Sequence, residues 1–156
     1  MSKQSSAEER EALLTALDTA LANSQAFSAN MAGMAQQKRL KPFAALYQHL
    51  NMMTNGSGWF AETLTTKMRD IGGFPLSYQV NKFRAEIKPE EPTDEFELSI
   101  KRASHYNALL LRSVKELEEA SKNGEDEELT QLADRASQII AGNIWLLQSM
   151  RQAQMN

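Results

Sequence analysis

The chain contains no cysteine among its 156 residues. This absence excludes disulfide bonds, thiolate nucleophiles and zinc or iron–sulfur sites built on cysteine. A chain without cysteine is typical of a reducing compartment such as the cytosol. The start of the chain, residues 1–10, is polar and acidic and does not resemble a secretory signal. We therefore expect a cytoplasmic protein.

Long hydrophobic runs and an excess of positive charge are also missing. No apolar run approaches the roughly 20 residues that a helix needs to cross a bilayer. The net charge is −3 and the pI is about 5.5, whereas attraction to nucleic acid requires clustered Lys and Arg. We interpret the short basic stretch at residues 38–41 as a solvated loop or helix end. The sequence therefore predicts neither a membrane nor a nucleic acid as partner.

Histidine is scarce, because His49 and His105 are the only two imidazoles in the chain. A site with three histidines from one chain is therefore excluded. Three roles stay open for each of the two: a lone metal ligand, a pH-sensitive group at an interface, or a partly buried side chain with one hydrogen-bonded nitrogen. The third role is the commonest for a single histidine.

Proline is rare as well, and its distribution divides the chain. Three of the four prolines lie between residues 75 and 92, so residues 72–93 form the longest predicted linker. On either side, apolar or small residues recur at alternating spacings of three and four, which is the pattern of packed helices. The predicted helices run from Ser5 or Ser6 to Ala35–Gln37, from Pro42 to Ile71, from Thr93 or Asp94 to Asn123, and from Glu125 or Asp126 onward.

Two of the predicted helices need comment. In the second, residues 54–58 read locally as a turn, but the apolar stripe keeps one phase on both sides of Gly56 and Gly58, so we predict a continuous helix. Two interior glycines cost about 1 kcal/mol each relative to alanine, and close approach of another helix would offset this. In the fourth helix, the predicted buried stripe comprises Leu129, Leu132, Ala136, Ile139, Asn143, Leu146 and Met150.

The linker lengths predict the topology. Short links join the first helix to the second and the third to the fourth, while one long crossover joins the second to the third. Residues 74–93 are too apolar for a free loop, so we expect a short helix or an ordered strap there. This arrangement is the ferritin-like topology, and we predict a single all-α domain over residues 1–156, an antiparallel four-helix bundle.

Three stretches of the chain support this topology. Residues 67–75 run into a Gly-Gly helix stop, residues 77–81 follow it, and residues 134–147 end in Trp-Leu. Together with the helix lengths and the mid-chain crossover, they resemble the mini-ferritin family of DNA-binding proteins from starved cells (Dps). The resemblance implies a homo-oligomer, from a dimer up to a dodecameric shell. It also implies iron oxidation, as part of a stress response, at sites between paired subunits.

The iron ligands that the resemblance implies are mostly missing. The family uses a histidine near the end of the first helix, where residues 26–33 contain none, and a His, an Asp and a Glu on the second helix. Those three positions fall on Tyr47, Glu62 and Thr66, so Glu62 alone remains as a possible ligand, and we favour a solvated or interface carboxylate as its explanation. The lysine-rich arm of the family is also missing, because residues 1–7 offer only Lys3.

Polar residues interrupt the apolar stripes at similar depths of the predicted bundle. They are Ser24, Ser28, Ser57, Asn107 and Asn143. Hydroxyls and amides are poor ligands for iron, which prefers carboxylate and imidazole, and the chain has no Glu-x-x-His pair of the ferritin type. One interpretation is a hydrogen-bonded layer that sets the helix register, with or without a buried water. The other is a small ligand pocket for a neutral molecule, opened by the two glycines.

Three functional hypotheses follow. The first is a Dps-like or ferritin-like oligomer that lacks the ferroxidase ligands, is not an enzyme, and has a binding or structural role. The second is an active mini-ferritin, a ferroxidase that binds and oxidises iron, the cofactor that the resemblance implies, through non-standard metal ligands, for which Glu62, His49 and His105 are the candidates. The third is a bundle that binds a small molecule in the polar layer. The methionines and tryptophans are expected to pack the core and an interface between subunits.

Overall fold

The structure, a computed structural model, describes residues 3–36, 43–72 and 95–155. These residues form four long helices and no strand: α1 (Lys3–Ala35), α2 (Ala44–Asp70), α4 (Glu95–Asn123) and α5 (Glu127–Met155). The predicted basic stretch at 38–41 and the predicted strap at 74–93 lie outside the described residues, as do the predicted starts at Pro42 and at Thr93 or Asp94.

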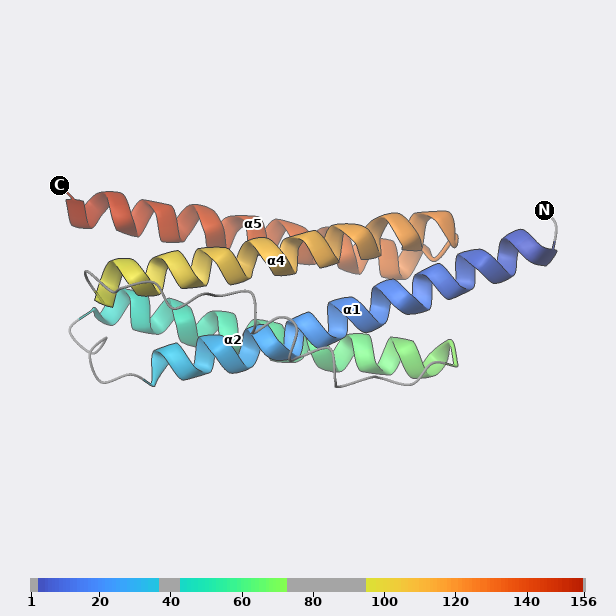
Figure 1. The fold of residues 1–156 in the computed structure, drawn as a ribbon, viewed down its shortest axis with the longest axis horizontal. Coiled ribbons are helices and arrows are strands. Elements are labelled where there is room, and N and C mark those ends of the chain that lie inside the picture. Colours follow the sequence, from blue (N-terminus) through green and yellow to red (C-terminus); the bar gives the residue numbers. More distant parts are fainter. Residues whose placement is uncertain (1–2, 37–42, 73–94, 156) are drawn as a thin grey trace.

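The helices form an antiparallel bundle (Figure 1). Helix α1 packs against α2 and α4, and α5 packs against α4 and more loosely against α2. Helix α2 ends at one end of the bundle and α4 begins at the other, so the two run in the same direction. The predicted four-helix topology, with its long connection between the second and third helices, is confirmed.

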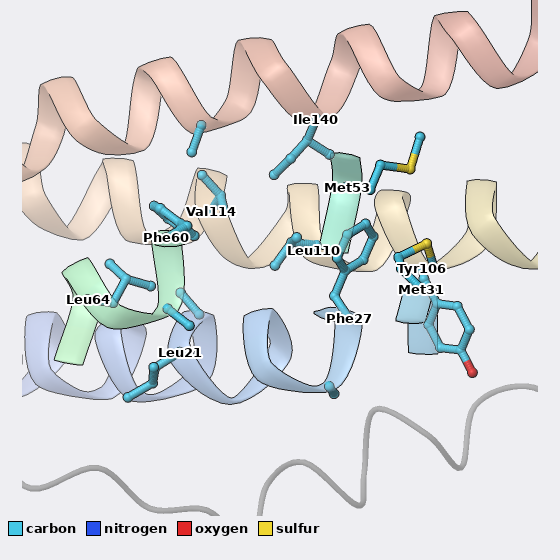
Figure 2. Close-up of a cluster of buried hydrophobic side chains, with 14 of the residues drawn as sticks. Leu21, Phe27, Met31, Met53, Phe60, Leu64, Tyr106, Leu110, Val114 and Ile140 are labelled. Atoms are coloured by element: carbon cyan, nitrogen blue, oxygen red, sulfur yellow. The ribbon is translucent and has the colours of Figure 1, made fainter. Parts of the chain in front are cut away.

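The core consists of apolar side chains from all four helices. Its side chains include Leu21 and Phe27 of α1, Phe60 and Leu64 of α2, Leu110 and Val114 of α4, and Ile140 of α5 (Figure 2). The stripe of α2 is buried from Leu46 to Met68 without interruption. Residues 54–58 are therefore helical, and the prediction of a continuous second helix is confirmed.

One part of the predicted core is wrong. Ile139 is 58% exposed, whereas the next residue, Ile140, is only 5% exposed. Leu129 and Ala136 are buried as predicted, and the other buried residues of α5 are Ala133, Ser137, Ile140 and Leu147. Both isoleucines satisfy a spacing of three or four from Ala136, so periodicity does not choose between them. The position of the neighbouring helices turns Ile140 inward and leaves Ile139 on the surface.

The end of the bundle where α2 stops is held by polar contacts between helices. The Arg10 Nη2 donates a hydrogen bond to the carbonyl oxygen of Ile71 over 2.7 Å. The Lys67 ammonium lies 3.0 Å from the carboxylate of Asp126. Asp126 also caps α5, because its Oδ1 accepts a hydrogen bond from the backbone N–H of Leu129 over 3.0 Å. These contacts tie α1 to α2, and α2 to α5.

We expect Asp126→Ala to lower the free energy of unfolding by about 1–2 kcal/mol, because it removes both the helix cap and the ion pair. Glu127→Ala is the matched control, since this exposed residue follows Asp126 and has neither contact. Urea unfolding at one fixed protein concentration measures the difference. Equal losses for the two variants would contradict the capping role.

Gly58 in α2 and Gly72 just after it should respond to alanine in opposite directions. At Gly58 a new Cβ would lie 3.8 Å from the Ser28 Oγ, an ordinary contact, so Gly58→Ala should stabilise the helix by about 0.5–1 kcal/mol. Gly72 has φ of +87°, a left-handed conformation that costs other residues about 1–2 kcal/mol, so Gly72→Ala should destabilise. Thermal unfolding of both variants checks the signs.

Candidate functional site

The three candidate metal ligands do not meet within one chain. His49 and Glu62 both lie on α2, and their separation of 13 residues corresponds to about 20 Å at 1.5 Å per residue. His105 is exposed on α4, which is not a close neighbour of α2. Within the described ranges, no group of three or more His, Asp or Glu side chains is placed to hold a metal ion. The described part of a single chain therefore does not assemble a metal site from these residues.

The positions that correspond to the family's ligands on the second helix are at the surface. Glu62 and Thr66 are exposed, and Tyr47 is 40% exposed. The Thr66 hydroxyl donates to the carbonyl oxygen of Glu62 over 3.2 Å, within its own helix. Glu62 is thus the only carboxylate among these three positions, and its side chain faces solvent in the single chain.

Four of the five polar residues predicted at mid-bundle form two hydrogen-bonded groups. In the first, the Asn143 Nδ2 donates to the Oδ1 of Asn107 over 3.3 Å. The Asn107 Nδ2 donates to the carbonyl oxygen of Ala103 over 2.8 Å and contacts the Met53 Sδ at 3.7 Å. Asn107 has no exposed surface. Its amide therefore joins α4 to α5 and contacts α2 at mid-bundle.

The second group joins α1 to α2 through one carbonyl. The hydroxyls of Ser28 and Ser57 each donate to the carbonyl oxygen of Thr54 over 3.1 Å. The Ser57 hydroxyl also contacts the carbonyl oxygen of Met53 over 2.8 Å. The remaining member, Ser24, bonds only to the carbonyl oxygen of Ala20 in its own helix, over 2.7 Å. Backbone carbonyls thus engage every one of these hydroxyls. This pattern favours a layer that sets the register of the helices.

Two interior polar features were not found from the sequence. The Asn23 Nδ2 donates to the Ser113 Oγ, which joins α1 to α4, and Ser113 in turn donates to the carbonyl oxygen of Leu109 over 3.3 Å. The Ser137 Oγ is buried without a hydrogen-bond partner among the described residues. Asn23 lies beside Ser24 in the sequence. An amide next to the apolar stripe of the first helix was the only feature of the sequence that could have indicated the contact with Ser113.

A surface groove between α1 and α4 gathers acidic side chains. Its lining includes Glu8, Glu9, Glu11, Glu116 and Glu119. The groove is open to solvent, and these carboxylates do not converge on a common point that would hold a metal ion. We interpret it as a solvated acidic surface, in line with the negative net charge.

We expect Asn107→Ala to lower the free energy of unfolding by about 2–3 kcal/mol, because it leaves a cavity and removes buried hydrogen bonds. Asn143→Ala should cost about 1 kcal/mol or less, since Asn143 is only partly buried. Urea unfolding of both single variants and of the double variant gives the coupling between them. Equal costs for the two single variants would argue against a central role for Asn107.

The described helices include none that is long and apolar enough to span a lipid bilayer. A scan against protein-family models finds no match, and no curated protein matches the sequence.

Solved structures do resemble the fold closely. A Dps protein from Vibrio cholerae O1, described as a member of the ferritin-like diiron-carboxylate superfamily, superposes with a TM-score of 0.77 at 19% identity, over 92% of this chain and 91% of that one. Dps from Thermosynechococcus elongatus gives 0.77 at 16% identity, over 93% of each chain. A Dps protein from Bacillus brevis gives 0.75 at 15% identity, over 96% of this chain and 99% of that one. The chain therefore has the ferritin-like fold of Dps proteins, as the sequence predicted.

Proposed function

We propose that this chain is the subunit of a Dps-like homo-oligomer that has a binding or structural role and does not oxidise iron. The observation that carries the proposal is the set of side chains at the family's ligand positions on α2. Tyr47, Glu62 and Thr66 supply one carboxylate, one phenol and one hydroxyl. Iron sites are built from carboxylates and imidazoles, so this set offers a single suitable ligand.

The interior of the bundle supports the same proposal. Diiron sites of ordinary ferritins lie inside the bundle, where carboxylates and histidines from facing helices converge. Here the corresponding depth is occupied by Asn107, Asn143, Ser28 and Ser57, whose donors are engaged by protein acceptors. Amides and hydroxyls with these partners stabilise helix packing and do not supply charge to compensate a ferrous ion.

A second candidate function is iron oxidation at a site between two chains. The observation that favours it is the exposure of Glu62 and His105, which leaves both side chains accessible to a ligand contributed by another subunit. The fold likeness to a diiron-carboxylate protein points in the same direction. Glu62, His49 and His105 would be the ligands to test.

Ferrous oxidation by metal-free protein separates the two candidates. We expect ferrous ion to oxidise at the same rate in buffer, in wild-type protein and in the Glu62→Ala variant, because the family positions provide one suitable ligand. Glu8→Ala, a change at another exposed glutamate, is the matched control. Rapid oxidation that disappears in Glu62→Ala and persists in Glu8→Ala would establish the second candidate and refute the first.

A further inference from the structure

One buried methionine of α2 takes part in the polar contacts of the interior. Met53 is 5% exposed and lies among the core side chains (Figure 2). Its Sδ is 3.7 Å from the Nδ2 of Asn107, which is wholly buried on α4. The other buried methionines, Met31, Met34 and Met68, have no hydrogen bond to sulfur within the described part of the chain. Met53 is thus the buried methionine whose sulfur faces a donor.

The amide of Asn107 is unevenly satisfied. Its nitrogen carries two hydrogens and its oxygen accepts. The oxygen accepts from Asn143 over 3.3 Å, and the nitrogen donates to the carbonyl oxygen of Ala103 over 2.8 Å. The remaining acceptor for the nitrogen is the Met53 thioether, and a thioether sulfur accepts hydrogen bonds only weakly. One N–H of a fully buried amide therefore lacks a strong acceptor.

Oxidation of the sulfur by a peroxide supplies such an acceptor. The thioether sulfur attacks one oxygen of hydrogen peroxide, so that an S–O bond forms and the O–O bond breaks. The other oxygen leaves as hydroxide and takes the proton of the transferred oxygen, which gives one sulfoxide and one water. Sulfur loses two electrons and the peroxide gains them. The product is polar and usually disrupts a core, because its oxygen is buried without a donor.

We propose that Met53 is a redox-sensitive position of the fold, at which a peroxide converts the weak contact with Asn107 into a strong hydrogen bond while the bundle stays folded. The sulfoxide oxygen accepts the N–H that now points at the sulfur. It thereby ties α2 to α4, whose Asn107 already bonds to α5. Reduction of the sulfoxide restores the thioether, since this oxidation is enzymatically reversible.

The chain contains matched references for this position. Met34 of α1 is 6% exposed, nearly the same as Met53, but its sulfur has no donor among the described residues. Met52, the neighbour of Met53 in the sequence, is 65% exposed, so water solvates its sulfoxide. The folded chain should therefore accept a sulfoxide at Met52 and Met53 and reject one at Met34.

The test measures which sulfoxides the folded chain accepts. In urea, a limiting dose of hydrogen peroxide reaches every methionine regardless of burial. After refolding, size-exclusion chromatography separates folded from misfolded chains, and peptide mass mapping locates the sulfoxides in each fraction. We expect the folded fraction to retain sulfoxide at Met53 at least about threefold more often than at Met34, which is the factor that one added hydrogen bond supplies. Met52 defines full retention.

Removal of the donor tests the role of Asn107. In Asn107→Ala, retention of sulfoxide at Met53 should fall to the level of Met34, while retention at Met52 stays unchanged. Asn143→Ala is the matched control, because it alters the same polar group and leaves the Asn107 Nδ2 in place. If Asn107→Ala does not refold, the comparison of Met53 with Met34 in the wild type still decides.

Oxidation of the folded wild type supplies an independent readout. We expect hydrogen peroxide to oxidise Met53 more slowly than Met52, without loss of the far-UV circular dichroism. The side-chain amide proton resonance of Asn107 should move downfield as its acceptor becomes stronger. None of these measurements involves iron or the oligomer, so their outcome is distinct from that of the proposed function.

Three results would overturn the inference. The first is equal exclusion of Met53 and Met34 sulfoxides from the folded fraction. The second is retention at Met53 that persists in Asn107→Ala. The third is a folded chain in which Met53 stays a thioether after Met52 has reacted completely. Retention at Met53 that depends on Asn107, together with the shifted amide resonance, would support it.

Discussion

Mutual burial of the four apolar stripes is the constraint on which the rest of this structure depends. Each helix exposes enough polar surface to be solvated on one side and must cover its other side with its neighbours. Leu17, Leu64, Leu117 and Leu147, one from each helix, are almost wholly buried, and burying a leucine contributes about 1.5–3 kcal/mol. Because this core fills the space between the helices, any polar group placed there must find its partner in the protein.

That requirement explains the chemistry of the interior. Asn107 meets Asn143 and the Met53 sulfur, while Ser28 and Ser57 share the carbonyl of Thr54. These groups join neighbouring helices at defined heights, which favours one register over its alternatives. The three candidate metal ligands, His49, Glu62 and His105, lie elsewhere on α2 and α4.

Sequence reasoning succeeded where one helix alone carries the information. The stripe of α2 from Leu46 to Met68 kept its phase through Gly56 and Gly58, so the helix was predictable despite two residues that favour turns. It failed where two helices decide together. Ile139 and Ile140 fit the periodicity of α5 equally well, and only the placement of α2 and α4 selects Ile140. The bond from Asn23 to Ser113 was missed for the same reason, because its partners lie on different helices.

The sequence by itself determined the all-helical class, the approximate ends of the helices, the absence of cysteine chemistry and the lack of iron ligands at the family's positions. These properties follow from residue types and from spacing along one helix, which local geometry converts directly into structure. Only the tertiary structure decided which isoleucine is buried, how the interior amides and hydroxyls pair, and that His49, Glu62 and His105 lie apart. Contacts between helices depend on packing that no local pattern specifies.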